Sequence, residues 1–188
     1  LDVLLVRILV EVVDAVGVPR GALRAAMAWF KYRGERRLAA VFAAGVAAYR
    51  EAHPTWFEEF DLVTAVPTFL GDGARRSWDP VGAIMAPLAA RLDPGWLVAP
   101  RAVTKIRETP GMAGLGWSAR QQVARGPLRR ALAVPDPALV AGRQGLVVDD
   151  VLTEGSTLRE VARALRRSGA TEVAGLVLAR PPWHPDPM

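Results

Sequence analysis

Cysteine is absent from the 188 residues, and only two histidines, His53 and His184, occur. The first absence excludes disulfides and thiolate metal sites, and it is compatible with a reducing cytoplasm, where we expect the protein. Two histidines are too few for a histidine-rich metal centre, so that class of site is excluded as well. Each histidine lies beside a proline in a loop-like or tail-like stretch, and we expect a plain surface role for both.

A long apolar run without charges is also missing. Residues 1–18 are strongly apolar, but Asp2, Arg7, Glu11 and Asp14 interrupt them. Charges spread so evenly exclude a membrane span, and acidic residues within the apolar region exclude a signal peptide. Arg7, Glu11 and Asp14 follow one another at spacings of four and three, which would place them on one stripe of a helix. We therefore expect residues 1–18 to form a largely buried amphipathic helix.

Apolar residues make up 51% of the chain, and the formal net charge is +5. A chain of this length and composition can bury one good core, so we expect one domain with an appendage. The expected division is an N-terminal helical segment, residues 1–55, packed on an α/β domain of residues 56–188 with a lid segment near residues 104–130. A basic surface suits polyanions, and both nucleic acid and a small pyrophosphorylated substrate qualify.

The most informative stretch runs from residue 145 to residue 169. Leu146, Val147 and Val148 have the length and β-branching of a strand buried on both faces, as in a parallel sheet. The carboxylates Asp149 and Asp150 end that strand, and a loop of mostly small or hydroxylic residues follows. A helical pattern then begins, with apolar residues at i, i+3, i+4 and i+7: Leu158, Val161, Ala162 and Leu165. The order is strand, acidic pair, small-residue loop and helix.

This order suits a phosphorylated sugar. A bend at Gly155 lets successive backbone N–H groups converge, and the N-terminus of the following helix adds about half a positive charge, so a phosphate can bind without a lysine. The hydroxyl groups of Thr153, Ser156 and Thr157 can add donors. The acidic pair lies one short loop away and can accept hydrogen bonds from vicinal ribose hydroxyls or bind a divalent cation.

Asp149 and Asp150 could instead be turn carboxylates that cap the next helix. That alternative has to explain two like charges side by side at the end of an apolar strand, where their repulsion costs free energy unless a cation or hydroxyl donors share them. We therefore favour the functional interpretation. The stretch is not a Walker loop, because no Gly-Lys-Ser/Thr sequence follows the strand.

The remaining pattern predicts further helices and strands on either side of this motif. One helix ends in residues 31–34, where Lys31 and Arg33 are either helix-end charges or functional cations, and Gly34 is a natural stop. Asp79 and Pro80 are expected to be the N-cap and first residue of a later helix. Helices are also predicted near residues 36–51, and strands at residues 61–67, 96–98 and 172–179.

Two basic segments could reach the same ligand. The loop of residues 68–79 follows a predicted strand and contains Arg75 and Arg76. Because the carboxyl ends of parallel strands meet in one crevice, both arginines could reach a diphosphate on the same ribose, although they could also be solvated loop charges. The lid segment has a poor core pattern and several cations, which suits either a mobile lid over an anionic ligand or a nucleic-acid contact surface.

Taken together, residues 22–180 resemble the ComF (competence protein F) branch of the type I phosphoribosyltransferases. The resemblance rests on the acidic pair with its loop, and on four further matches. These are the Lys-Tyr-x-Gly segment at residues 31–34, the strand end at residues 65–67, the arginine loop at residues 75–80, and part of a lid motif at residues 113–115 with Arg120 and Gly126.

The resemblance implies an α/β fold with a parallel sheet of about five strands flanked by helices. It implies that Asp149 and Asp150 are the catalytic pair and bind Mg²⁺ or the ribose hydroxyls. The residues expected to bind phosphoribosyl pyrophosphate, or a nucleoside monophosphate, are Thr153, Glu154, Gly155, Ser156, Thr157, Arg75, Arg76 and Lys31. Chemistry in this superfamily displaces pyrophosphate at the anomeric carbon and requires no protein nucleophile.

The chain departs from the family pattern at several positions. It lacks the usual cysteine-ligated zinc ribbon, and Trp78, Met112, Val123 and Glu154 replace the family's usual residues. A carboxylate that pointed into a phosphate site would repel the ligand, so we expect Glu154 to point outward, toward Arg159 or the lid arginines, with only its N–H serving the phosphate.

Two functions remain open at this stage. One is a magnesium-dependent phosphoribosyltransferase with an amine or base acceptor. The other is a non-catalytic module that senses nucleotides or phosphoribosyl pyrophosphate in DNA uptake or DNA binding. No membrane contact is expected, whereas weak nucleic-acid binding and a homodimer stay open.

Overall fold

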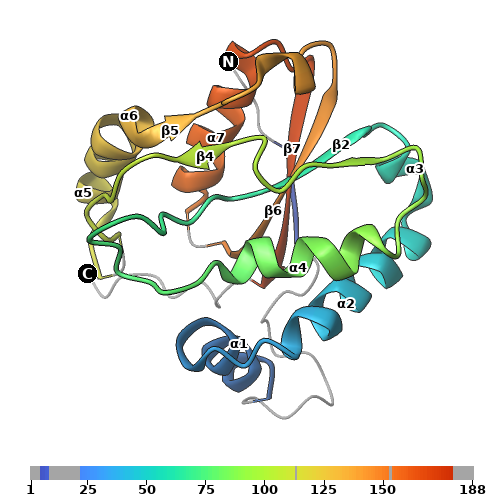
Figure 1. Ribbon diagram of the computed structural model, residues 1–188, viewed down its shortest axis with the longest axis horizontal. Helices are drawn as coiled ribbons and strands as arrows, with labels where there is room; N and C mark the ends of the chain where they lie inside the picture. Colours follow the sequence, from blue (N-terminus) through green and yellow to red (C-terminus); the bar gives the residue numbers. More distant parts are fainter. Residues whose placement is uncertain (1–4, 9–21, 113, 153, 180–188) are drawn as a thin grey trace, which may run out of the picture.

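The computed structural model describes residues 5–8, 22–112, 114–152 and 154–179. Five strands form one sheet in the order β1-β7-β6-β2-β3, and all four neighbouring pairs are parallel (Figure 1). This confirms the expected α/β fold with a parallel sheet of about five strands. The strands are β1 (Leu5–Ile8), β2 (Leu62–Ala65), β3 (Leu97–Val98), β6 (Gln144–Val151) and β7 (Glu172–Ala179).

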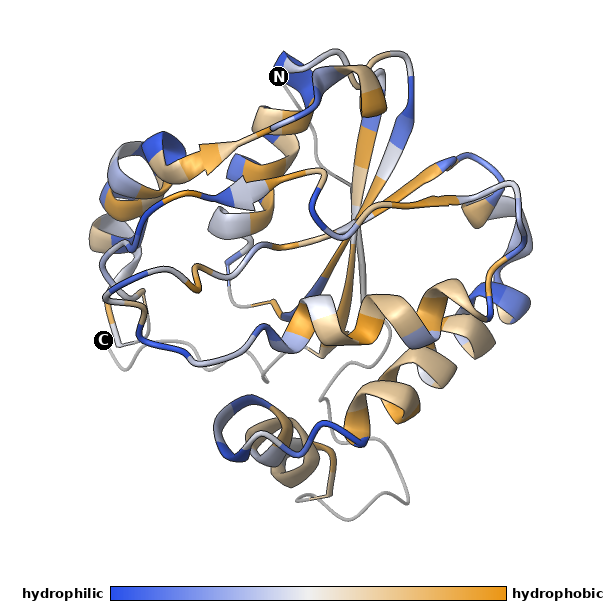
Figure 2. Ribbon diagram, in the orientation of Figure 1, coloured by the Kyte–Doolittle hydropathy of each residue, from blue (hydrophilic) through white to orange (hydrophobic). Residues whose placement is uncertain are grey.

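Helices cover both faces of the sheet (Figure 1). On one face pack α1 (Ala22–Arg33), α2 (Leu38–Ala52), α3 (Pro54–Phe57) and α4 (Pro80–Ala89), and on the other α7 (Ser156–Arg167). Leu146 and Val148 belong to the core under the first group, whereas Val147 belongs to the core under α7. Alternate residues of β6 therefore fill two separate cores, because successive side chains of a strand point to opposite faces. Figure 2 shows the resulting hydrophobic centre of the sheet.

The helix expected over residues 1–18 is wrong where the structure describes that segment. Leu5–Ile8 is the edge strand β1, which pairs in parallel with β7 so that Leu5 lies opposite Ala174. The sequence of β1, Leu-Val-Arg-Ile, contains two β-branched residues that suit a pleated sheet, and a free sheet edge overrides the helical spacing of the charges. Residues 1–4 and 9–18 lie outside the described part of the chain.

Local signals placed the ends of two helices correctly. Gly34 follows α1 with a φ of +68°, a backbone conformation that glycine adopts without strain. Asp79 is the N-cap of α4, since its side chain accepts a hydrogen bond from the backbone N–H of Gly82 at 3.1 Å, and Pro80 is the first helical residue. This cap fixes the end of the loop that carries Arg75 and Arg76.

The segment of residues 104–133 forms a small unit of its own beside α7 (Figure 1). Its two ends pair as an antiparallel ladder between β4 (Thr104–Lys105) and β5 (Leu132–Ala133). Between them lie α5 (Trp117–Val123), the π-helical turn η1 (Ala124–Leu128) and α6 (Arg129–Ala131), and a short 3-10 turn, η2 (Pro137–Leu139), leads on to β6. We call residues 104–133 the lid segment from here on. Within the described residues, no helix is both long enough and apolar enough to cross a bilayer.

Candidate functional site

The acidic pair lies within the last residues of β6. The strand extends to Val151, and the N–H of Leu152 still donates to the carbonyl of Ala179 on β7 at 2.9 Å. Asp150 is buried, with 5% of its surface exposed, whereas Asp149 is partly exposed. The pair is therefore held by the sheet rather than by a turn, and it does not cap the next helix. Neighbouring residues of a strand point to opposite faces, so the two carboxylates meet different partners.

Asp150 forms an ion pair with Lys31 from the last turn of α1. The Lys31 Nζ lies 2.8 Å from Oδ1 and 2.7 Å from Oδ2 of Asp150. Only 19% of the lysine side chain and 6% of the aspartate side chain are exposed. Lys31 is therefore more than a helix-end charge, because it crosses from the helical layer to the end of the central strand.

Asp149 is held in an environment that favours its protonated form. Burial raises its pKa to about 8, and the negative charge of Asp150 adds to this shift; the N–H of Asp150 and the charges of Lys31 and Arg76 oppose it. That N–H donates to Asp149 Oδ1 at 2.8 Å. At neutral pH Asp149 thus favours its protonated form, while Lys31 pairs with Asp150. A bound cation would favour the ionised form of Asp149.

The loop after β6 begins α7 at the same edge of the sheet. Gly155 has a φ of +71°, and a Cβ there would lie 3.3 Å from Leu152 Cδ1, so both the bend and the space favour glycine. Ser156 is the first residue of α7 and is 7% exposed. Asp149, Gly155, Ser156 and Thr157 line one cavity of about 60 Å³. Thr153, the first expected phosphate ligand, lies outside the described residues.

Arg120 of α5 closes this cavity from the lid side. Together with Met112 it lines the cavity wall, and its Nε donates to the Met112 carbonyl at 3.2 Å. Its Nη1 lies 2.9 Å from Oε1 of Glu154 in the loop. Glu154 thus faces the lid, as expected. Its other oxygen, Oε2, is buried and has no hydrogen-bond partner among the described residues.

The two adjacent loop arginines have different surroundings. Arg76 lies close enough to Asp149 for its charge to lower the pKa of that carboxyl, and its guanidinium lies 5.8 Å from the centre of the Tyr32 ring. Arg75 turns toward the lid segment, where its Nη1 occupies the space beside Gly111. The structure therefore brings Arg76 to the acidic pair and leaves Arg75 apart from it.

Glu108 ties the arginine loop to the base of the lid segment. Its carboxylate accepts hydrogen bonds from the N–H of Arg75 at 3.1 Å and the N–H of Thr109 at 2.9 Å, and from Lys105 Nζ at 3.1 Å. Burial alone would raise the pKa of Glu108, but these partners lower it to about 2. Glu108 was not among the residues expected from the sequence.

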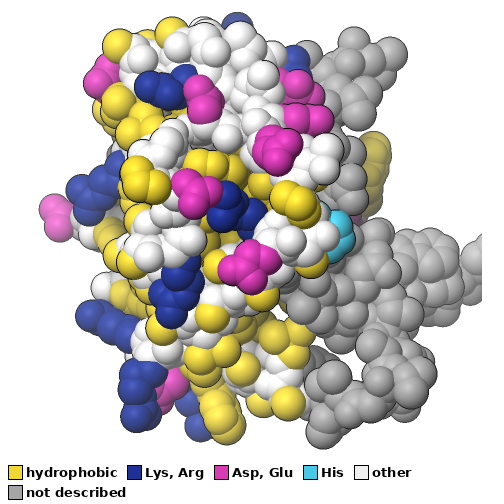
Figure 3. Space-filling model, turned by 90° about the vertical axis from the view of Figure 1, so that its right-hand side faces the viewer, with side chains coloured by type: hydrophobic (Ala, Val, Ile, Leu, Met, Phe, Trp, Pro, Cys, Tyr) yellow, Lys and Arg dark blue, Asp and Glu magenta, His cyan; other side chains and the backbone are white. Residues whose placement is uncertain are grey.

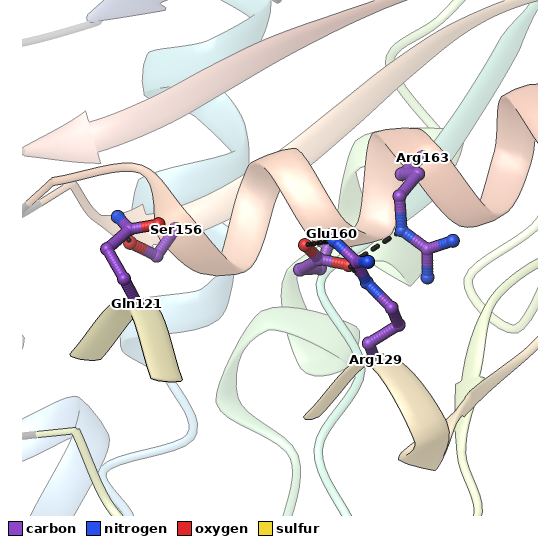
Figure 4. A network of polar contacts seen from close by, with 5 residues as sticks. All are labelled: Gln121, Arg129, Ser156, Glu160 and Arg163. Carbon is purple, nitrogen blue, oxygen red and sulfur yellow. Dashed lines mark hydrogen bonds and ion pairs between the residues drawn. The ribbon is translucent and has the colours of Figure 1, made fainter. Parts of the chain in front are cut away.

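A second unexpected network fastens the other end of the lid segment to α7 (Figure 4). Glu160 is 5% exposed and accepts two hydrogen bonds from Arg129, at 2.9 and 2.7 Å, and one from Arg163 at 2.7 Å. Burial would raise the pKa of Glu160, but the two arginines hold it below its usual value. Nearby, Gln121 Nε2 donates to the Ser156 hydroxyl at 2.9 Å. The sequence held a signal for this network. Glu160 is a carboxylate on the polar side of a predicted helix, and the lid segment is rich in arginine.

The residues present suit magnesium only together with a ligand. Within the described ranges, no cluster of three or more His, Asp or Glu side chains could hold a metal ion. Magnesium in proteins is commonly bound by one or two carboxylates plus substrate oxygens and water. Asp149 and Asp150 match that donor set if a phosphorylated ligand supplies the remaining oxygens.

The acidic pair and the glycine-containing loop lie at the carboxyl ends of parallel strands, which is where open α/β sheets commonly bind their ligands. The model of the phosphoribosyl transferase domain family matches residues 86–186, more than half of the chain. The chain belongs to this family.

Curated relatives share part of the chain. The DNA utilization protein YhgH of Escherichia coli K12 is 32% identical over 120 residues, which is 64% of this chain and 49% of that protein. The chain thus spans about half of the length of this relative. The amidophosphoribosyltransferase of Synechocystis is 43% identical over 47 residues, which is 25% of this chain and 10% of that enzyme.

Solved structures of phosphoribosyltransferases share lower identity with the chain. The glutamine phosphoribosylpyrophosphate amidotransferase of B. subtilis has a TM-score of 0.44 and 23% identity, covering 80% of this chain and 27% of that one. A hypoxanthine phosphoribosyltransferase of Staphylococcus aureus has a TM-score of 0.44 and 11% identity, covering 78% of this chain and 65% of that one.

Proposed function

We propose that the protein binds phosphoribosyl pyrophosphate with magnesium and transfers its phosphoribosyl group to an amine or base acceptor. The observation that carries the proposal is the cavity shared by Asp149, Gly155, Ser156 and Thr157, which sets a carboxylate beside the N-terminus of α7. A ribose 5-phosphate needs acceptors for its hydroxyls and donors for its phosphate, and these two parts supply both. Membership in the phosphoribosyl transferase domain family supports phosphoribosyl transfer as the class of reaction.

Each part of the site has a distinct task in this proposal. Asp149 and Asp150 accept hydrogen bonds from the ribose hydroxyls or hold Mg²⁺, with Lys31 fixing the position of Asp150. The loop of residues 153–157 binds the 5-phosphate through backbone N–H groups and hydroxyls, and the carboxylate of Glu154 stays turned to Arg120. Arg76 faces the pyrophosphate. Arg75 would have to turn away from Gly111 to join it.

The proposed reaction is a displacement at the anomeric carbon. The bond from that carbon to the pyrophosphate oxygen breaks, the acceptor nitrogen forms a new bond to the same carbon, and the acceptor loses a proton. Magnesium, when bound, neutralises charge on the leaving pyrophosphate. The chain's own task is to hold the ribose and phosphate in place and to stabilise developing charge, for which no nucleophilic side chain is needed.

Thermal unfolding with ligand tests the binding step. Phosphoribosyl pyrophosphate at millimolar concentration with magnesium is expected to raise the melting temperature, because a ligand at 100 times its Kd stabilises the folded state by about 2.7 kcal/mol. In a chain of this size that corresponds to a rise of roughly 5–10 °C. Ribose 5-phosphate and magnesium alone are the controls. If the melting temperature of a well-folded sample does not change, this cavity is excluded as a binding site for phosphoribosyl pyrophosphate.

The second candidate function is a non-catalytic module that senses nucleotides or phosphoribosyl pyrophosphate in DNA uptake or DNA binding. Relatives named DNA utilization proteins support it, and so does the small volume of the cavity beside Asp149, about 60 Å³. Pyrophosphate release in the presence of candidate amines and bases would favour the enzyme, whereas tight binding without turnover would favour the module. Basic and acidic side chains are interspersed on the face drawn in Figure 3, so DNA contacts made there would be weak and sensitive to salt.

Replacing Glu154 by threonine separates the two candidates further. Since Glu154 faces Arg120, Glu154→Thr is expected to change the Kd for phosphoribosyl pyrophosphate by less than about threefold, or under ~0.7 kcal/mol. Calorimetric titration of both proteins measures this, with Glu172→Thr at the exposed start of β7 as the matched control. A gain in affinity of about tenfold or more would mean that the carboxylate obstructs the phosphate site, and it would favour the sensing module.

A further inference from the structure

A second and larger cavity lies between the lid segment and α7. Its volume is about 570 Å³, within the range of small-molecule sites. Ser156 borders both this cavity and the small one at Gly155. Five arginines and one glutamate line it, and we call it the arginine groove: Arg125, Arg129, Arg159, Arg163, Arg166 and Glu160.

The positive charge of the arginine groove exceeds what its own carboxylate balances. Glu160 pairs with Arg129 and Arg163. Arg125 and Arg159 are exposed, and neither has an ion pair within the described part of the chain. Clustered guanidinium groups repel one another, so such a groove favours an anion with several acceptor oxygens, and guanidinium geometry matches phosphate.

The groove also has an aromatic side chain at its rim. Trp117, the first residue of α5, lines the cavity, yet 66% of its surface is exposed. An indole beside guanidinium groups offers a stacking face for a nucleobase and donors for the phosphates attached to it. Inorganic phosphate alone would leave this ring unused.

The length of the basic stripe limits the size of the ligand. Arg159, Arg163 and Arg166 follow one another at i, i+4 and i+7 on α7, which spans about 10 Å at 1.5 Å per residue. That length suits a chain of two or three phosphates. Proteins that bind single-stranded nucleic acid through such contacts cover about 4–16 nucleotides per module, a longer track than this stripe.

We propose that the arginine groove is a second ligand site, which binds a nucleoside di- or triphosphate separately from the phosphoribosyl pocket. The phosphates contact Arg125 and Arg159 together with the arginines already placed by Glu160, and the base stacks on Trp117. The bound nucleotide contacts α5 at Gln121. The chain neighbour of Gln121, Arg120, is the residue that pairs with Glu154.

A titration with methylanthraniloyl-ATP tests this site. Magnesium is chelated, so that the acidic pair does not hold a metal-bound ligand, and probe fluorescence is followed. The double variant Arg125→Ala with Arg159→Ala is expected to bind the probe at least about tenfold more weakly, since charged hydrogen-bond donors are lost without breaking an ion pair. Trp117→Ala is expected to weaken binding by about fivefold or more.

The matched control is Arg130→Ala with Arg167→Ala. Both residues are exposed and are chain neighbours of groove arginines, but neither lines the groove. Its probe affinity is expected to stay within about twofold of the parent, since the net charge changes equally but no groove contact is lost. Equal loss in both double variants would show attraction by net charge alone and would overturn the proposal.

Two further outcomes would also overturn it. If Asp149→Asn with Asp150→Asn abolishes probe binding, the nucleotide lies in the phosphoribosyl pocket instead. If a labelled single-stranded DNA binds far more tightly than the nucleotide with the same dependence on Arg125 and Arg159, the groove is part of a strand-binding surface. Circular dichroism and melting temperatures verify that each variant is folded.

Discussion

Replacing both Asp149 and Asp150 by asparagine is expected to weaken the binding of phosphoribosyl pyrophosphate with magnesium by a factor of about 100 or more, or roughly 2.8 kcal/mol. Asparagine keeps the size of each side chain but removes the anionic oxygens that the ribose hydroxyls and Mg²⁺ require. Isothermal titration calorimetry of the parent and the variant measures the loss. Unchanged affinity would show that the acidic pair is structural.

The single variants are expected to differ in stability because the two carboxylates have different partners. Asp150→Asn leaves the mostly buried Lys31 without its ion-pair partner, and this lowers the free energy of unfolding. Asp149→Asn breaks no ion pair, and it removes the cost of keeping a carboxyl protonated in the folded protein at neutral pH. Stability of the double variant is therefore the balance of these opposite effects, and chemical denaturation of all three proteins separates them.

The elements that the sequence predicted well are those fixed by local signals. The alternation of Leu146, Val147 and Val148 between two cores, the cap at Asp79 and the turn at Gly155 each depend on residues a few positions apart. Such signals are present in any short stretch of sequence, so they place β6, the start of α4 and the loop before α7 without knowledge of the tertiary fold.

The elements that it missed depend on distant partners. β1 was expected to be a helix because only the edge of β7, more than 150 residues away, makes it a strand. Lys31 meets Asp150 across 119 positions, and of the lid arginines that Glu154 was expected to face, it is Arg120 that meets it, across 34. The residue types were visible in the sequence, but spacing along one chain cannot say which cation faces which carboxylate.

The sequence thus predicted which residue types lie at the candidate site, but not how their charges are balanced. The sequence presented Asp149 and Asp150 as two adjacent anions. In the fold, Lys31 neutralises Asp150, while burial shifts Asp149 toward its protonated form. This balance explains how an acidic pair can be kept at the end of an apolar strand before a ligand arrives.

Asp149→Asn is expected to make the free energy of unfolding much less dependent on pH. Because the pKa of Asp149 is about 8 in the folded protein and near 3.8 in the unfolded chain, only the folded protein holds this proton between those values. The contribution of Asp149 to stability is therefore complete below about pH 4 and falls as pH rises toward 8, by at most about 1.4 kcal/mol per pH unit. The asparagine cannot lose a proton, so the variant lacks this decline.

Urea unfolding without ligand or magnesium, from pH 5 to pH 9, measures this difference. The free energies of unfolding of the parent and Asp149→Asn are expected to diverge as the pH rises. The difference in favour of the variant grows up to about pH 8 and stays constant at higher pH. Asp72→Asn, in an exposed loop, is the control and is expected to follow the parent at every pH. Parallel curves for the parent and Asp149→Asn would show that Asp149 is already ionised in the folded protein. In that case the binding of a cation to the acidic pair would release no proton from Asp149.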